Sequence, residues 1–193
     1  MGDPRKKRKK YETPKHPWKA SRIQSEKEIS KEYAFKNKRG IWKMQSLLRE
    51  FTSQAKKLST ATTEQGKKEK EQLIKKLFRL GLIKENAQLD DILNLGLNDI
   101  LERRLQTILF RKSLSRTMKQ ARQFITHHHI LVGGKIITSP SYLVLSDEEN
   151  RISFKQKSSL AKEDHKERIK KETEKTAEKK KVKRKLIKVI RKK

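Results

Sequence analysis

Residues 101–144 read LERRLQTILFRKSLSRTMKQARQFITHHHILVGGKIITSPSYLV, and their pattern is the strongest indication of the fold in this chain. Its first half repeats apolar residues at spacings of three and four, which indicates amphipathic helices. Its second half places two aliphatic runs around Gly133-Gly134, the pattern of a β-hairpin with a two-residue turn. The order helix, helix, hairpin predicts a small unit that contains both helix and sheet.

Capping residues suggest where these two helices begin. The first is predicted to start at Asn98 or Asp99 and to run to about Phe110, and the second to start at Ser115 or Thr117. Their inward faces are expected to hold Leu101, Leu105, Ile108, Met118, Ala121 and Ile125. The hairpin is predicted over 130–137, and a further strand over 142–145.

Both helices carry cations away from their apolar stripes. Glu102 is the only acid between 101 and 145, whereas a surface that serves solubility alone mixes both signs. A solvated charged face is the plainer alternative, and contact with RNA phosphates is the interpretation favoured here. The predicted RNA-binding residues of this unit are Arg103, Arg104, Arg111, Lys112, Ser115, Arg116, Lys119, Arg122, Gln123 and Lys135.

The residues before this unit have a helical pattern. Possible capping boxes begin at Ser25 and Thr62, the segment 37–40 separates two helices, and a short helix is expected at 90–94. Gly81 is a plausible helix end, because glycine tolerates positive φ. The apolar stripes comprise Ile41, Met44, Leu48, Phe51, Ala55, Leu58, Leu73, Leu77 and Leu80.

The charge of the whole chain limits the kinds of molecule that it can be expected to bind. The 193 residues include 52 Lys or Arg and 23 Asp or Glu, a net charge of +29. Such a surplus requires a polyanion, either nucleic acid or an anionic membrane surface. Only 32% of the residues are hydrophobic, so we expect small modules with charged extensions rather than one large core.

The charge is distributed over the ends and the middle. Residues 1–22 hold nine Lys or Arg and two acids, and residues 155–193 hold 18 Lys or Arg and six acids. Three prolines prevent one continuous helix in the first segment. We predict an extended arm that contacts RNA, with a disordered tail or a nuclear import signal as the alternative. Its predicted RNA-binding residues are Arg5, Lys6, Lys7, Arg8, Lys9, Lys10 and Trp18.

Several other functions lack support in the sequence. There is no cysteine, so disulfides and thiolate zinc sites are excluded. No apolar run approaches the roughly 20 residues that span a bilayer. The three histidines at 127–129 are adjacent, and adjacent side chains point in different directions, so no metal site is expected. Neither a catalytic triad nor a phosphate-binding glycine loop is present.

The stretch from 101 to 144 resembles the RNA-binding module named after small-subunit ribosomal protein S-four. The similarity lies in ERRL, SR…ARQ-I, H-x-H-I-x-V-x-G-K and SPSY, and the opening MGDPRKKRKKYETPKHPW resembles the arm of the archaeal form. The resemblance implies that His127 and His129 face RNA. Two positions depart from the family pattern, because His128 stands where a glycine is usual and Gly133-Gly134 where Asn-Gly is usual.

The resemblance also implies a function. It predicts a non-enzymatic protein of the cytoplasmic small ribosomal subunit, without cofactor, metal, membrane or homo-oligomer. Its partners would be 16S-type ribosomal RNA in the 5′ domain, neighbouring proteins such as the S-five family protein, and mRNA near the channel where it enters. It would nucleate assembly and contribute to translational accuracy.

Other functions remain open alternatives at this point. They are a ribosome-assembly factor with the same module, an RNA-modifying enzyme and a protein of membrane surfaces. The predicted fold class is α+β. Its expected parts are a basic arm at 1–22, a helical module at 23–97, the S-four-type module at 98–154 and a basic extension at 155–193.

Overall fold

The computed structural model describes residues 9–162 and 165–167. Most of its regular structure is helical, and a small antiparallel sheet supplies the rest, which confirms the predicted fold class. The elements in chain order are α1 (Ala20–Glu32), α2 (Lys38–Ser59), α3 (Glu64–Arg79), α4 (Leu89–Leu93), α5 (Leu97–Glu102), α6 (Leu105–Arg111), α7 (Met118–Thr126), β1 (Ile130–Val132), β2 (Lys135–Ile136), α8 (Ser146–Glu149), β3 (Ile152–Phe154) and the 3-10 helix η1 (Ser159–Ala161).

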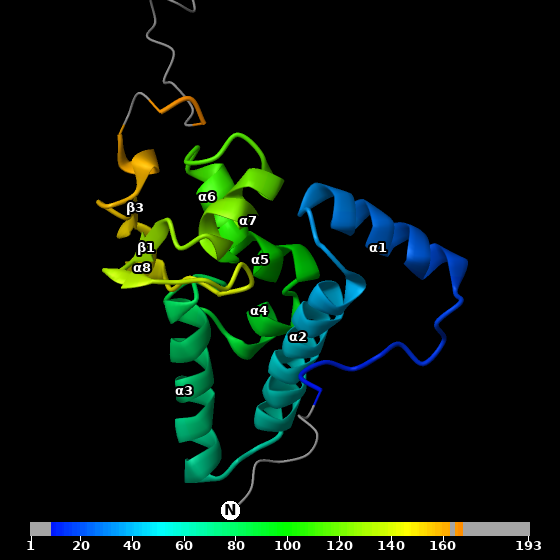
Figure 1. Cartoon of the computed structure of the whole chain (residues 1–193). Helices are drawn as coiled ribbons and strands as arrows, with labels where there is room; N and C mark the ends of the chain where they lie inside the picture. Colours follow the sequence, from blue (N-terminus) through cyan, green and yellow to red (C-terminus); the bar gives the residue numbers. More distant parts are fainter. Residues whose placement is uncertain (1–8, 163–164, 168–193) are drawn as a thin grey trace, which may run out of the picture.

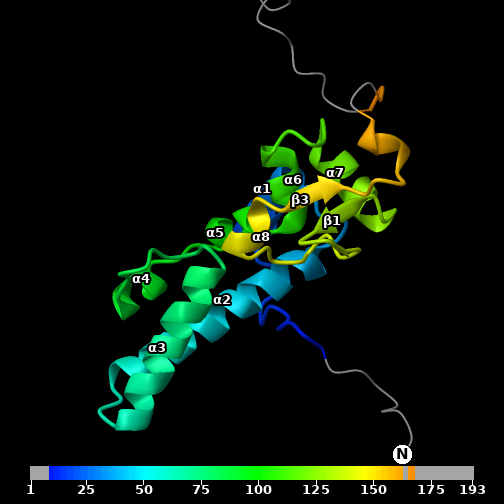
Figure 2. The same cartoon turned by 90° about the vertical axis from the view of Figure 1, so that its left-hand side faces the viewer.

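The helical module is built on α2 and α3, which lie side by side and run in opposite directions (Figure 1). The apolar stripe of α2 faces α3, α4 and α5, and Phe51, Leu77 and Ile92 are fully buried between them. Most of the predicted stripe residues are therefore core residues, whereas Leu48, Leu58 and Leu80 are partly buried against the cluster. The short helix expected at 90–94 is α4. Figure 2 shows that α2 and α3 project away from the end of the molecule that carries the sheet.

Helix α1 is joined to α2 through a buried carboxylate. Glu26 is only 1% exposed, and it accepts hydrogen bonds from Trp42 Nε1 at 2.9 Å and Arg22 Nη1 at 3.0 Å. Lys38 Nζ lies 3.3 Å from its second oxygen. A charge at this depth is tolerated because several partners neutralise it.

Two predicted capping boxes are wrong. Helix α1 begins at Ala20, and Ser25 lies inside it, where its hydroxyl donates to the Arg22 carbonyl at 2.9 Å. The cap of α3 is Thr63 rather than Thr62, and its side chain accepts from Gly66 N at 3.2 Å. Since both neighbouring threonines can act as caps, only the backbone path distinguishes them.

The second core lies between α6, α7 and the sheet. Leu105, Ile125 and Ile130 are completely buried there, and Phe124, which the periodicity did not include, is buried with them. Leu101 is the last buried residue of the first apolar cluster, and Leu105 is the first buried residue of the second. The domain boundary placed at 97/98 remains a prediction.

The sheet has the strand order β2-β1-β3, with both pairs antiparallel. The hairpin prediction is confirmed, because Val132 pairs with Lys135 across a turn in which Gly133 and Gly134 have φ of 56° and 81°. The predicted strand at 142–145 is wrong. The third strand is β3, and the segment before it makes a single bridge, between Arg104 and Leu143.

The predicted single helix over 98–110 is also wrong, because it is broken between α5 and α6. The Leu105 N–H donates to the Tyr142 carbonyl at 2.8 Å, and the Val144 N–H donates to the Arg103 carbonyl at 3.0 Å. The backbone groups freed by the break are thereby satisfied from the segment that follows the hairpin. Thr107 Oγ1 adds a bond to the Leu101 carbonyl at 2.7 Å.

Within the described residues, four helices are followed by a residue at positive φ. After α7, the N–H groups of His128 and His129 donate to the carbonyls of Ile125 and Phe124, which is a Schellman motif. The position at positive φ is occupied by Ala34 after α1, Gly81 after α3, Ser113 after α6 and His128 after α7. His128, which stands where the family usually has glycine, therefore has a φ of 61°, in the left-handed region that glycine adopts most easily.

We predict that His128→Gly raises the free energy of unfolding by about 1 kcal/mol, because a left-handed residue with a Cβ is strained by roughly 1–2 kcal/mol. The matched change His127→Gly is expected to lower stability, since His127 has φ of −90° and gains nothing from glycine's freedom. Urea unfolding of both full-length variants measures the difference. Equal effects of the two changes would contradict this account.

Candidate RNA-binding surface

The outer face of α7 carries a stripe of polar side chains. Ala121, Phe124 and Ile125 are buried on the inner face, and this leaves the opposite face in solvent. Thr117 caps the start of the helix, because its side chain accepts a hydrogen bond from Gln120 N at 3.1 Å. Of the two predicted starts, Ser115 and Thr117, the second is therefore confirmed. The exposed residues at helical spacing are Arg116, Lys119, Gln123 and His127, and Arg122 is half-buried at their side.

A cleft lies between the C-terminal end of α1 and α7. It is lined by Ser30, Lys31, Ala34, Phe35, Lys36, Lys119 and Arg122. Lys119 and Arg122 were predicted, whereas Lys31 and Lys36 were not, because nothing in the sequence indicates that the end of α1 reaches α7. Among the residues the structure describes, no carboxylate lines this cleft, so four cations share it without an anion.

Arg103 and Arg104 do not lie on this surface, and the expectation that both are exposed cations is wrong. The Arg103 side chain is 16% exposed, and its guanidinium donates to Glu149 at 2.7 Å and to the Val144 carbonyl at 3.1 Å. Arg104 is 2% exposed and lies over the Phe35 ring at 4.1 Å. Both are turned inward because the break between α5 and α6 changes the direction of these two side chains.

Unlike Arg103, Arg104 forms no ion pair with a carboxylate of the described residues. Its Nε and Nη1 atoms are buried and have no hydrogen-bond partner within the described part of the chain. Burial, and to a smaller extent the charge of Arg122, lower the pKa of Arg104 to about 10. The group remains a cation at neutral pH.

Arg111 keeps an exposed side chain but is paired. Its Nη2 and Nε donate to the two oxygens of Glu102 at 2.7 and 3.1 Å, and 61% of the side chain stays exposed. The hydrogen bond from Arg111 holds the pKa of Glu102 below its ordinary value. Tyr33 also donates to Glu102, at 3.1 Å, and burial followed by this bond raises the pKa of Tyr33 to about 12.

Three further predicted residues have mainly internal contacts in this structure. Lys112 Nζ donates to the Glu149 carbonyl and lies 3.5 Å from Asn150 Oδ1. Ser115 is fully buried, which contradicts its expected exposure. Arg116 donates from its guanidinium to the Lys166 carbonyl, although the residue remains exposed. Lys135 is exposed on β2, at the hairpin.

A second hollow adjoins α7 on the side of the sheet. Gln123, His127 and His129 line it together with Phe124, Ser159, Leu160, His165 and Glu167. His129 Nδ1 lies 2.8 Å from Ser158 Oγ, and its ring meets Phe124 edge to face at 6.3 Å. Burial, and then the charge of His127, lower the pKa of His129. The described residues contain no group of three metal-ligating side chains suited to an ion.

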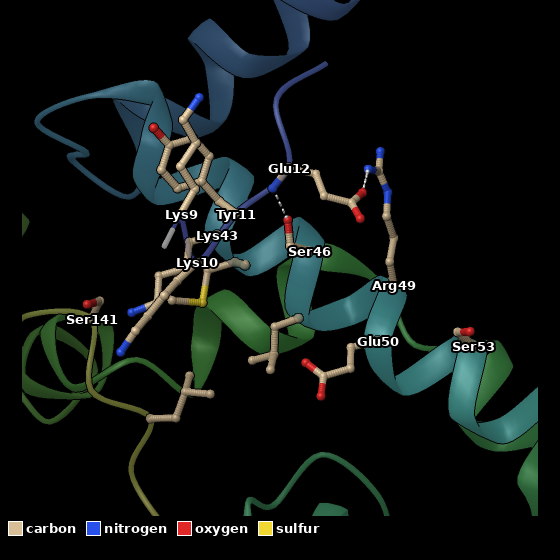
Figure 3. Close-up of a pocket in the computed structure, with 13 residues that line it drawn as sticks. Lys9, Lys10, Tyr11, Glu12, Lys43, Ser46, Arg49, Glu50, Ser53 and Ser141 are labelled. Carbon is tan, nitrogen blue, oxygen red and sulfur yellow. Dashed lines mark hydrogen bonds and ion pairs between the residues drawn. The ribbon is translucent and has the colours of Figure 1, made fainter. Parts of the chain in front are cut away.

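The described part of the basic arm lies against α2 (Figure 3). The Glu12 N–H donates to Ser46 Oγ at 2.9 Å, and the Glu12 carboxylate accepts from Arg49 at 3.0 Å. The exposed Lys9 and Lys10 line a pocket with Lys43 from α2. Trp18 is 89% exposed. The predicted contacts Arg5, Lys6, Lys7 and Arg8 lie outside the described residues, as does most of the C-terminal extension.

Comparison with known proteins agrees with this geometry. Residues 103–150 match the family described as the S4 domain. Small ribosomal subunit protein uS4 of Methanococcus aeolicus is 55% identical over 169 residues, which cover 87% of this chain and 96% of that protein. The proteins of the same name from Methanococcus maripaludis and Methanococcus vannielii are 53% and 52% identical, over 87% of this chain and 95% of each relative.

The paired helices, hairpin and cationic face define a protein of the S4-domain class. The similarity to the Methanococcus proteins covers 87% of the chain and therefore identifies the family as well as the class. The chain belongs to the uS4 family of small ribosomal subunit proteins. The recognition made from the sequence is confirmed, and with it the prediction that the chain is not an enzyme. Within the described residues, no helix has the length and apolar character needed to cross a bilayer.

We predict that acidification destabilises the fold through His129. Because its folded pKa lies below the ordinary value, the fold favours the neutral ring; that contribution is present above the unfolded pKa of about 6.5 and is lost as pH falls. The thermal midpoint should therefore fall more between about pH 7.5 and pH 5.5 in the parent chain than in His129→Gln. The exposed His16, changed to Gln, serves as the control. If the thermal midpoint of His129→Gln falls as much as that of the parent chain, His129 is not the cause of the acid destabilisation.

Proposed function

We propose that this chain is a structural constituent of the small ribosomal subunit and binds 16S-type ribosomal RNA directly. The observation that carries the proposal is the cleft beside α7, where four cations line one cavity and no described carboxylate does. Elsewhere the fold pairs cations with acids, as at Glu26, Glu102 and Glu149. Family membership supports the same function.

Binding would depend on phosphate contacts made from several elements at once. Lys119 and Arg122 lie on α7, Lys135 at the hairpin, and Lys9 and Lys10 on the arm. Lysine makes point contacts with phosphate, and arginine can make two parallel hydrogen bonds. His127 and Gln123 add donors that suit a phosphate or a 2′-hydroxyl. Such an array recognises the shape of folded RNA rather than a linear sequence.

Finer parts of the proposal rest on the family resemblance. They are contact with the 5′ domain, early nucleation of assembly, a neighbour of the S-five family, and a place beside the channel where mRNA enters. A contribution to translational accuracy belongs with them. An assembly factor with the same module would bind precursor RNA but would be absent from mature subunits.

We expect the chain to co-sediment with mature small subunits after a high-salt wash, because several separated contact regions must dissociate together. In isolation, the logarithm of its RNA association constant should fall linearly with the logarithm of salt concentration, since bound counterions are released. Filter binding to a 5′-domain transcript measures that slope. A flat slope would disprove phosphate binding, and recovery only with precursor particles would support the assembly factor.

We expect Trp18→Ala to weaken binding to the same transcript by about five- to 150-fold, because stacking on one base contributes roughly 1–3 kcal/mol. Its exposure of 89% indicates that stability will not change. The control is Phe78→Ala on α3, which removes an exposed aromatic ring away from α7. If both variants bind like the parent chain, the arm does not stack on RNA through Trp18.

A further inference from the structure

The cleft between α1 and α7 combines features of an anion site. Its volume is about 490 Å³, and its lining joins two lysines of the helical module with two cations of α7. Ser30 adds a hydroxyl, and Phe35 supplies an apolar wall. Since no described carboxylate lines it, the repulsion among Lys31, Lys36, Lys119 and Arg122 is not compensated there.

A second, independent observation concerns the contact between Arg104 and Phe35, a residue that lines the cleft. The Arg104 guanidinium packs on the ring of Phe35, is almost completely buried, and keeps two nitrogen atoms without a hydrogen-bond partner in the described chain. Burying a cation without a counter-charge is costly. Arg104 lies close enough to Arg122 for the two charges to interact. The positive charge of Arg104 therefore adds to that of the four cations that line the cleft.

We propose that this cleft is a subsite for one phosphate group of the RNA backbone, held by Lys31, Lys36, Lys119 and Arg122, with the buried Arg104 nearby. The inference rests on the proposed function and deepens it. Phosphate suits the site because its oxygens can accept from several cations together, including the paired donors of Arg122. A single bound phosphate would compensate charges that the fold leaves unpaired.

The position of the subsite has a structural consequence. Lys31 and Lys36 come from α1 and the segment before α2, whereas Lys119 and Arg122 come from α7. One phosphate would thus connect the helical module to the S4 domain at a place where cations from both modules repel each other. Phosphate binding should therefore stabilise the packing of the helical module against the S4 domain, in addition to attaching the chain to RNA.

The subsite can be tested without RNA by titrating inorganic phosphate into the full chain labelled with ¹⁵N-arginine, against sodium chloride of equal ionic strength. The Nε–Hε signal of Arg122, assigned with Arg122→Lys, should shift and saturate at phosphate concentrations at least about fivefold lower than for Arg79. Arg79 is exposed in the last turn of α3 and is the control. Equal titration of the two signals overturns the subsite.

A second measurement compares binding of a 5′-domain transcript by Lys36→Gln and Lys68→Gln. Lys36 lines the cleft, and Lys68 is exposed on α3, so each change removes one surface charge. Lys36→Gln should weaken binding about tenfold, because a charge-assisted hydrogen bond is lost, and Lys68→Gln less than about twofold. Equal effects overturn the subsite and leave the proposed function intact. Selective phosphate binding without any RNA binding would refute the proposed function and leave the subsite intact.

Discussion

The backbone pairing between residues 103–105 and 142–144 is the constraint on which the rest of the structure depends. It breaks the helix between α5 and α6 and satisfies the freed groups through Leu105 N to the Tyr142 carbonyl and Val144 N to the Arg103 carbonyl. It sends Arg103 toward Glu149 and Arg104 toward Phe35. It also fixes the segment that leads from the hairpin to β3. The change from one apolar core to the other occurs at this break.

The scarce acids of the chain explain which cations remain available. Glu26 lies between Arg22, Lys38 and Trp42, Glu102 binds Arg111 and Tyr33, and Glu149 binds Arg103. Each of these carboxylates holds elements together at a joint of the fold. The cleft beside α7 has no carboxylate among the described residues that line it. Structural ion pairs therefore use some cations and leave the unpaired ones concentrated where a polyanion can reach them.

The candidate surface could be predicted only in part. Lys119, Arg122 and Gln123 follow from the amphipathic period of α7, because its apolar stripe determines the opposite face. His127 followed only from the family resemblance. Arg104 was misplaced, since the same reasoning assumed an unbroken helix through 98–110. Lys31 and Lys36 were missed because residues far apart in the chain meet only after the modules pack. Helix ends show the same limit. Glycine at position 81 indicates a positive φ, whereas the residue types of Ala34 and Ser113 do not indicate the positive φ that both adopt.

The sequence by itself determined the fold class, the hairpin, the family and the strongly basic character of the protein. These properties depend on local periodicity, turn chemistry and recognisable motifs, all of which involve residues close together in the sequence. The tertiary structure alone decided that Arg103 and Arg104 are internal, that β3 rather than 142–145 completes the sheet, and that α1 contributes to the cationic cleft. Those outcomes follow from backbone groups and charges finding partners across long distances in the chain, and no local pattern encodes that choice.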